Sequence, residues 1–225
     1  MSRLRAIVLD FDGVVLESAD IKTRAFETLF AEHEDHVTEI VDLHLRLAGV
    51  SRYEKFRMIY ADILELPLSD EQCEALGERF SQIALEQILA APFVAGAREF
   101  IAGRAESQLL FIGSGTPQDE LRNIVKARGL EPYFCGVYGT PETKHQILVR
   151  IMAEHRLGPD SLVFVGDAMT DFEGAREAGV PFIGRVPQGL PSPFPEAENV
   201  PLVEDLAELE RAIDDLLPVL ARQAG

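Results

Sequence analysis

The stretch Ala6-Ile7-Val8-Leu9-Asp10-Phe11-Asp12-Gly13 joins a short apolar run to two carboxylates and a glycine. Its apolar residues are continuous rather than alternating, which is typical of a strand covered on both faces of a parallel sheet. Two later runs, Leu109-Leu110-Phe111-Ile112 and Leu162-Val163-Phe164-Val165, have the same character. The pattern predicts three central strands of one sheet.

Helical patterns separate the later strands. Apolar residues recur at helical spacing over 117–128, 145–155 and 172–178, and a further strand is expected at 181–183. An amphipathic helix over 204–217 is expected to end before Pro218, because proline is disfavoured inside helices. This alternation predicts an α/β fold whose core is a Rossmann-like, doubly wound parallel sheet.

Residues 19–91 interrupt this rhythm after the first strand. They contain several helical patterns and no clear strand, so they are expected to form an inserted, all-helical cap domain. The core is then formed by residues 1–18 and 92–225. The stretch 187–201 is rich in proline, glycine and serine and is expected to be a loop.

Charge and composition restrict the partners. With 21 Lys and Arg against 38 Asp and Glu, the chain has a net charge of −17, which disfavours nucleic acid and anionic membranes as partners. The first apolar run is broken at Asp10, so it is too short for a signal peptide, and a cytoplasmic location is expected. Cys73 and Cys135 lack metal-ligand spacing and are expected to be buried thiols.

Polar residues follow each of the three apolar runs. Asp10 and Asp12 follow the first, Ser114 the second and Asp167 the third. In doubly wound sheets, ligands bind outside the carboxyl ends of the strands. These side chains are therefore expected to converge at one sheet edge, where Lys144 and Asp171 would join them from the starts of two helices.

Taken together, these residues resemble the haloacid dehalogenase superfamily of aspartyl-phosphate phosphotransferases. Asp10-Phe11-Asp12-Gly13-Val14-Val15 matches the first family motif, and Ser114 after its apolar run matches the second. Lys144 matches the third, and Gly166-Asp167-Ala168-Met169-Thr170-Asp171 matches the fourth. A helical insert between motifs one and two is similar to that of phosphoglycolate-type phosphatases and β-phosphoglucomutases.

The resemblance implies a role for each of these residues. Asp10 would attack phosphorus and form an aspartyl phosphate, which splits one difficult displacement into two steps. Asp12 would act as general acid and then as general base. Ser114 would donate to the phosphoryl group, and Lys144 would offset the negative charge. Gly13 would allow a sharp turn.

The resemblance also implies a metal site and a phosphate site. Mg²⁺ prefers oxygen ligands, and the family pattern supplies the Asp10 carboxylate, the Asp12 backbone carbonyl and the Asp167 carboxylate. Asp171 would lie behind these ligands or bind the metal directly. The phosphate would lie against Gly13, Ser114 and Gly115.

The expected cap contributes two candidate substrate contacts. Gly49-Val50-Ser51-Arg52 is similar to the cap loop of β-phosphoglucomutases, in which the matching arginine contacts substrate phosphate. Alternatively, Ser51 starts a helix and Glu54 completes a capping box. Lys22 stands where those mutases have a histidine, so it is either a substrate contact or an exposed lysine. His44 is expected to be exposed.

These expectations favour a Mg²⁺-dependent phosphatase that acts on a small phosphorylated metabolite. A sugar phosphomutase of the β-phosphoglucomutase type is the nearest alternative, which Lys22 disfavours. A dehalogenase would lack the second acid that Asp12 supplies. A phospho-acceptor signalling module and a non-catalytic binding protein are alternatives of another class. The sequence indicates neither the substrate nor the oligomeric state.

Overall fold

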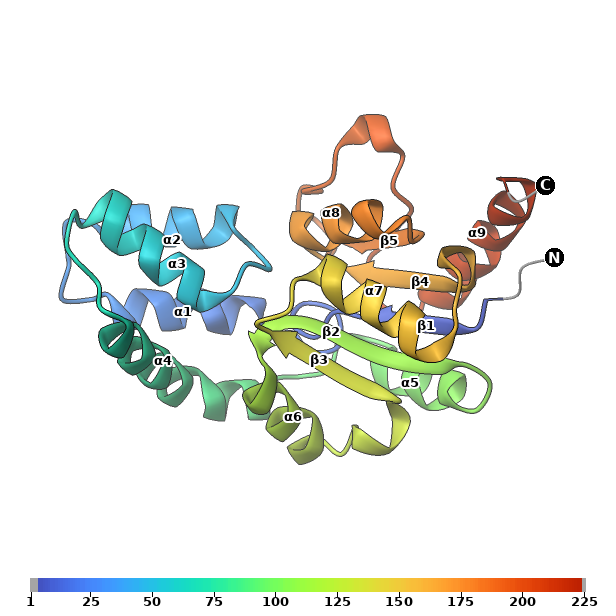
Figure 1. Ribbon diagram of the computed structural model, residues 1–225, viewed down its shortest axis with the longest axis horizontal. Coiled ribbons are helices and arrows are strands. Elements are labelled where there is room, and N and C mark those ends of the chain that lie inside the picture. Colours follow the sequence, from blue (N-terminus) through green and yellow to red (C-terminus); the bar gives the residue numbers. More distant parts are fainter. Residues whose placement is uncertain (1–3, 224–225) are drawn as a thin grey trace.

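The computed structural model describes residues 4–223 and shows a twisted sheet with helices on both faces and a further group of helices at one end (Figure 1). The strands are β1 (Ala6–Leu9), β2 (Leu109–Pro117), β3 (Gly136–Thr140), β4 (Leu162–Gly166), β5 (Phe182–Arg185) and β6 (Leu202–Val203). Their order is β3-β2-β1-β4-β5-β6 and all pairs are parallel. The predicted doubly wound α/β fold is confirmed.

The helices fall into two groups (Figure 1). Between β1 and β2 lie α1 (Ala19–Leu29), α2 (Val37–Arg46), α3 (Arg52–Met58), the π-helical turn η1 (Ile59–Ile63) and α4 (Asp70–Ala90). Around the sheet lie α5 (Ala97–Ala105), α6 (Gln118–Ala127), α7 (Lys144–His155), α8 (Met169–Ala178) and α9 (Leu209–Gln223), with 3₁₀ turns at Glu131–Tyr133, Pro159–Ser161 and Glu196–Glu198. The first group is the expected all-helical insert, called the cap below; its limits at 19 and 91 remain a prediction.

Burial on both faces explains why β1 has a continuous apolar run. Ile7 and Leu9 belong to the hydrophobic cluster that includes residues of α5, α6 and α9. Ala6 and Val8 belong to a second cluster, formed with residues of α7 and α8. Because successive side chains of a strand point to opposite faces, every residue of this strand is buried.

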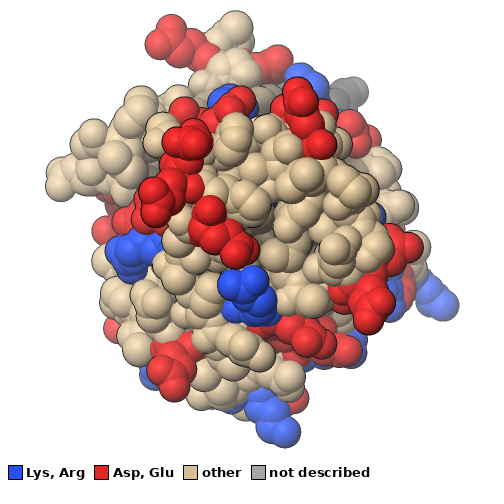
Figure 2. Space-filling model, turned by 90° about the vertical axis from the view of Figure 1, so that its left-hand side faces the viewer, with Lys and Arg blue, Asp and Glu red and all other residues tan. Residues whose placement is uncertain are grey.

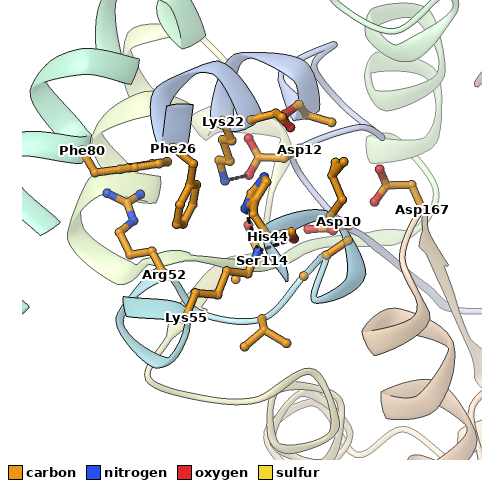
Figure 3. A pocket seen from close by; sticks show the side chains of 17 residues that line it. Asp10, Asp12, Lys22, Phe26, His44, Arg52, Lys55, Phe80, Ser114 and Asp167 are labelled. Atoms are coloured by element: carbon orange, nitrogen blue, oxygen red, sulfur yellow. Dashed lines mark hydrogen bonds and ion pairs between the residues drawn. The ribbon is translucent and has the colours of Figure 1, made fainter. Parts of the chain in front are cut away.

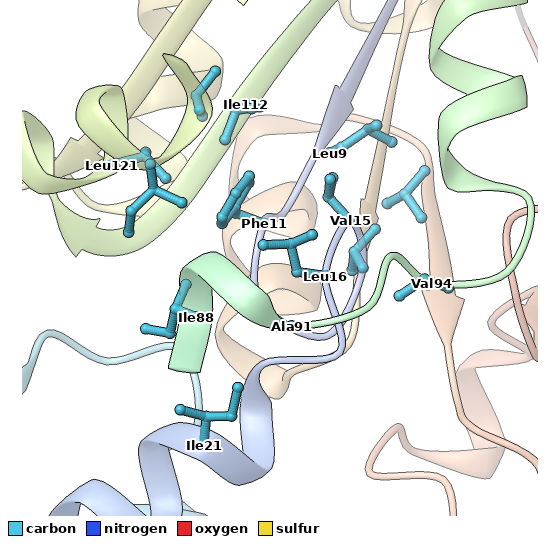
Figure 4. Packing of buried hydrophobic residues seen from close by; sticks show 14 of the residues in the cluster. Leu9, Phe11, Val15, Leu16, Ile21, Ile88, Ala91, Val94, Ile112 and Leu121 are labelled. Carbon is cyan, nitrogen blue, oxygen red and sulfur yellow. The ribbon is translucent and has the colours of Figure 1, made fainter. Parts of the chain in front are cut away.

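Two chain segments join the cap to the sheet and pair with each other. The Val94 N–H donates to Val15 O at 3.1 Å, and the Glu17 N–H donates to Pro92 O at 3.0 Å. Next to them, Phe11 and Leu16 belong to the same buried cluster as Ile88 at the end of α4 (Figure 4). One apolar core therefore continues from the sheet into the cap and sets where the cap lies over the strand ends.

The structure corrects several expectations. The edge strands β3 and β6 are absent from the sequence prediction. The closing helix begins at Leu209 rather than at 204 and continues through Pro218 to Gln223, because proline removes one backbone donor without preventing helix beyond it. Cys73 is buried, but Cys135 is exposed. None of the helices formed by residues 4–223 is both long and apolar enough to cross a membrane.

Candidate active site

A cavity of about 130 Å³ lies between the carboxyl ends of the strands and the cap (Figure 3). The core contributes the predicted site residues Asp10, Asp12, Ser114, Gly115 and Asp167 to its wall. The cap contributes Lys22, Phe26, His44, Arg52, Lys55 and Phe80, among others. The cavity therefore brings together residues that are more than a hundred positions apart in the sequence.

Lys144 lies behind the cavity and holds two carboxylates. Its Nζ is 2.9 Å from Asp10 Oδ1 and 2.5 Å from Asp171 Oδ1, and it donates to Gly113 O at 2.9 Å. Lys144 is the first residue of α7, whose N-terminus is capped by Thr143, the acceptor of the Gln146 N–H at 3.3 Å. The capped start of α7 therefore places one cation between two buried acids.

Three carboxylates crowd this edge of the sheet. Burial and the neighbouring charge of Asp171 raise the pKa of Asp10 to about 7, although Lys144 opposes the shift. Burial and repulsion from Asp10 and Asp171 also raise the pKa of Asp167 well above its usual range. Each of these three residues offers an oxygen within 4.8 Å of the others. Because Mg²⁺ prefers oxygen ligands and a dication would relieve this repulsion, the donor set fits the predicted metal.

Asp171 is fully buried and has a structural task as well. Its Oδ2 accepts from the N–H groups of Asp167, at 3.2 Å, and Ala168, at 3.1 Å. It lies in the first turn of α8 and reaches back to the start of the helix. Asp171 thus holds the turn that carries Asp167, and its direct ligation of a metal remains a prediction.

Asp12 points toward the cap rather than toward the other acids (Figure 3). Its carboxylate accepts from Ser18 Oγ at 2.7 Å and Thr116 Oγ1 at 3.0 Å, and it forms an ion pair with Lys22. Burial raises the pKa of Asp12, but the charge of Lys22 and these hydrogen bonds outweigh burial, so the pKa lies below its usual value. Asp12 is therefore ionised in this conformation, and Lys22 is not an exposed lysine.

The predicted glycines stand where a side chain would have no room. Gly13 has a φ of 77°, and a Cβ there would lie 1.9 Å from Asp167 Oδ2, so the expected sharp turn is present. A Cβ at Gly115 would lie 2.5 Å from the carbonyl oxygen of Gly49 in the cap. Ser114 is buried beside it, and its Oγ accepts from the Thr116 N–H at 3.2 Å.

Arg52 lines the cavity but has protein partners. Its guanidinium donates to Ser81 Oγ on α4 at 2.7 Å and to Glu120 Oε1 on α6 at 2.8 Å, and it lies 4.4 Å from the centre of the Phe80 ring. It thus links the cap to the core. Ser51 precedes α3 as expected, but its side chain forms no capping hydrogen bond with the described residues.

Two cavity residues were missed or misplaced by the sequence analysis. His44 is 8% exposed, so the expectation of an exposed histidine is wrong. It shares a helix face with the buried residues Ile40 and Leu43, and its ring stacks on Phe26 at 4.3 Å. Lys55, which no motif indicated, is 3% exposed and has its Nζ 3.0 Å from His44 Nδ1. Lys55 lies four residues before the apolar Ile59, and this helical spacing was the signal for its burial.

Comparison with known proteins shows which proteins this chain is similar to. The phosphoglycolate phosphatase of Shigella boydii serotype 4 (strain Sb227) is 24% identical over 241 residues, which are 96% of this chain and 92% of that protein. A hydrolase from Pseudomonas syringae has the same fold, with a TM-score of 0.76 and 18% identity over 94% of this chain and 98% of the other.

CbbY from Rhodobacter sphaeroides, solved with phosphate, gives a TM-score of 0.71 and 16% identity over 92% of this chain and 96% of the other. The family model for haloacid dehalogenase-like hydrolases matches residues 4–179, which include the whole cap and all four motifs. With that match and the four motifs gathered at one sheet edge, the chain belongs to the haloacid dehalogenase-like hydrolases.

Proposed function

We propose that this hydrolase is a phosphatase that cleaves the phosphate monoester of a small metabolite through an aspartyl phosphate on Asp10. The observation that carries the proposal is the Asp10 carboxylate, which is buried at the end of β1, bound to Lys144 at 2.9 Å and open to the cavity. The relatedness to a phosphoglycolate phosphatase supports the same reaction class.

Burial and fixed hydrogen bonds prepare the site for phosphoryl transfer. Asp10 attacks phosphorus from a position that Lys144 holds, while the Ser114 hydroxyl donates to a phosphoryl oxygen. Asp12, across the cavity, is ionised in this conformation, so it first takes up a proton from solvent or from a protonated substrate phosphate. It then donates this proton to the leaving alkoxide and withdraws one from the attacking water. Lys22 keeps the ionised form of Asp12 favourable between these steps.

Mg²⁺ is the cofactor that these residues fit. The carboxylates of Asp10 and Asp167 and the backbone carbonyl of Asp12 would hold it, with Asp171 behind them or bound directly. When bound, it supplies positive charge that offsets the carboxylates and the phosphoryl oxygens. Calcium, with its looser and higher coordination, is expected to inhibit.

The contact between Lys22 and Asp12 favours a phosphatase over a sugar phosphomutase. The mutases that this cap resembles have a histidine at the position of Lys22, and a histidine can take up and release a proton near neutral pH. In this protein Lys22 is instead held in an ion pair with Asp12. In an assay with β-glucose 1-phosphate and a trace of the 1,6-bisphosphate, we expect free phosphate and no glucose 6-phosphate. Faster formation of glucose 6-phosphate than of phosphate would contradict the assignment.

The proposal is tested by phosphate release from monoesters with Mg²⁺ and with a chelator. Asp10→Asn is nearly isosteric, so we expect a folded protein that does not turn over, because an amide cannot form the acyl phosphate. Asp119→Asn, the same change at an exposed position on α6, is the matched control, and its activity is expected to be unchanged. Multiple turnover by Asp10→Asn at the wild-type rate, or full activity in chelator, would overturn the mechanism.

A further inference from the structure

Lys55 is a buried residue in the wall of the cavity. Its Nζ lies 3.0 Å from His44 Nδ1 and donates to the His44 carbonyl oxygen at 3.2 Å. Among the ion pairs of residues 4–223, none includes Lys55. An ammonium has three donors, so these two contacts leave one for another group. In Figure 3 the side chain runs from α3 toward Ser114, into the cavity.

The other basic residues of the cavity are already compensated. Lys22 is paired with Asp12, and Arg52 with Glu120. Burial, together with the charges of Lys22 and Arg52, lowers the pKa of Lys55 to about 7. A buried charge is costly unless an opposite charge accompanies it. The charge of Lys55 is therefore buried at a cost in free energy that an anion bound in the cavity would offset.

His44 fixes the position of this amine. Burial and the charge of Lys55 lower the pKa of His44 to about 3, so its ring is neutral. Its Nδ1 accepts from the ammonium, which leaves the proton on Nε2. The imidazole thus orients Lys55 without neutralising it, whereas a carboxylate at this position would have cancelled the charge.

The basic residues that line the cavity do not reflect an excess of basic residues in the cap as a whole. Residues 19–91 contain fifteen acidic and seven basic residues, yet none of these acidic residues lines the cavity, while Lys22, Arg52 and Lys55 do. Figure 2, which faces the cap end of the molecule, shows acidic side chains around much of the outer surface. The cap therefore directs its acids outward and presents cations to the cavity.

We propose that Lys55, oriented by His44, binds a second anionic group of the substrate, a carboxylate or a second phosphate on the alcohol side of the ester. This inference rests on the proposed phosphatase function and names its substrate class. Typical cavities for drug-sized ligands measure about 300–1,000 Å³, whereas this one has about 130 Å³. The substrate is therefore a compact ester, with few atoms between its phosphate and its second anion.

The experiment compares esters that differ only in the second charge. One pair is 2-phosphoglycolate and 2-hydroxyethyl phosphate; the other is 1,3-propanediol bisphosphate and 1,3-propanediol monophosphate. We expect the wild type to prefer one of the anionic esters at least about tenfold in kcat/KM. A hydrogen bond to a charged group corresponds to about a 10- to 100-fold effect, so Lys55→Met is expected to lose that preference. The preferred pair identifies the anion as carboxylate or phosphate.

The matched control is Lys126→Met, which removes the same charge from an exposed position on α6. We expect it to keep the wild-type preference. A cooperative urea unfolding transition shows that Lys55→Met is folded; if this variant has none, Lys55→Gln takes its place. A preference for the anionic ester that persists in the Lys55 variant, or its absence in the wild type, would overturn the subsite.

Failure of the proposed function is distinguishable from failure of the subsite. If the wild type hydrolyses none of the four esters with Mg²⁺, the phosphatase assignment fails. Calorimetric titration with 2-phosphoglycolate and with 1,3-propanediol bisphosphate then tests the subsite alone. At least about tenfold weaker binding of one of them to Lys55→Met than to the wild type supports the subsite. Equal binding of both by the two proteins contradicts it.

Discussion

The two walls of the cavity carry opposite charges and are built in different ways. The core wall presents Asp10, Asp12 and Asp167 from the ends of strands, where short apolar runs determine their place. The cap wall presents Lys22 from α1 and Lys55 from α3, two helices that α2 separates in the sequence. This difference fits the proposed function, in which the core wall performs the chemistry and the cap wall selects the leaving group.

The largest expected effect comes from breaking the charge balance of the core wall. Lys144→Met removes the cation between Asp10 and Asp171, which are both buried. Loss of one partner of a buried ion pair typically costs about 3–5 kcal/mol. We expect the free energy of unfolding, measured in urea without metal, to fall by that order. Lys126→Met is the control. Equal stability of the two variants would show that Lys144 is not needed to offset the charges of Asp10 and Asp171.

Removing the charge of Lys55 from the cap wall is expected to raise the stability of the protein rather than lower it. Lys55 has a pKa of about 7 in the folded protein and an ordinary value of 10.5. Below pH 7 both states are charged and the folded state bears the cost of burial. Between pH 7 and 10.5 only the folded state has lost the proton, so wild-type stability rises with pH.

Lys55→Met has no such proton to lose. Beside His44, the groups facing this side chain are the cations Lys22 and Arg52, so the substitution also removes repulsion. We expect the variant to be more stable than the wild type at pH 6, on the order of 1–4 kcal/mol, with the gain shrinking toward pH 10. Urea unfolding across this range measures it. A pH-independent difference or a less stable variant would contradict an uncompensated charge.

The core wall and the cap wall also differ in how far they could be predicted from the sequence. The acids of the core wall and Lys144 could be predicted because each directly follows a buried strand or starts a helix. The edge strand β3 was missed because Gly136-Val137-Tyr138-Gly139-Thr140 lacks a continuous apolar run. As an edge strand, it is less buried than β1 or β4.

The cap wall could be predicted only in part. Lys22 and Arg52 were proposed from the resemblance, but their contacts with Asp12 and Glu120 depend on how helices pack on the core. The signal for His44 and Lys55 was a polar residue at an apolar position of a helical repeat. A polar residue at such a position is compatible with two structures. Either the helix is rotated so that the residue faces solvent, or the residue is buried and functional, and only the packed structure distinguishes the two.

A smaller effect links the two walls through Lys22. The ion pair with Lys22 keeps the pKa of Asp12 low, and without it burial raises that pKa. In the proposed mechanism Asp12 must be ionised to activate water, so Lys22→Met is expected to lower kcat about tenfold at neutral pH. The acid limb of the kcat profile is expected to move to higher pH, whereas Lys22→Arg keeps it. A change confined to KM would place Lys22 on the substrate instead.

The smallest expected effect concerns the bridge between the walls. Arg52 on α3 binds Glu120 on α6 at 2.8 Å, and both side chains also contact Ser81. If the bridge holds the cap in place, Arg52→Met and Glu120→Gln raise KM by similar factors, about threefold each. The double variant is then no worse than either single one, because contacting residues are not additive. Asp119→Asn, an exposed neighbour, is the control. If Arg52 instead binds substrate, Arg52→Met raises KM far more, and Glu120→Gln lowers KM because it frees the guanidinium.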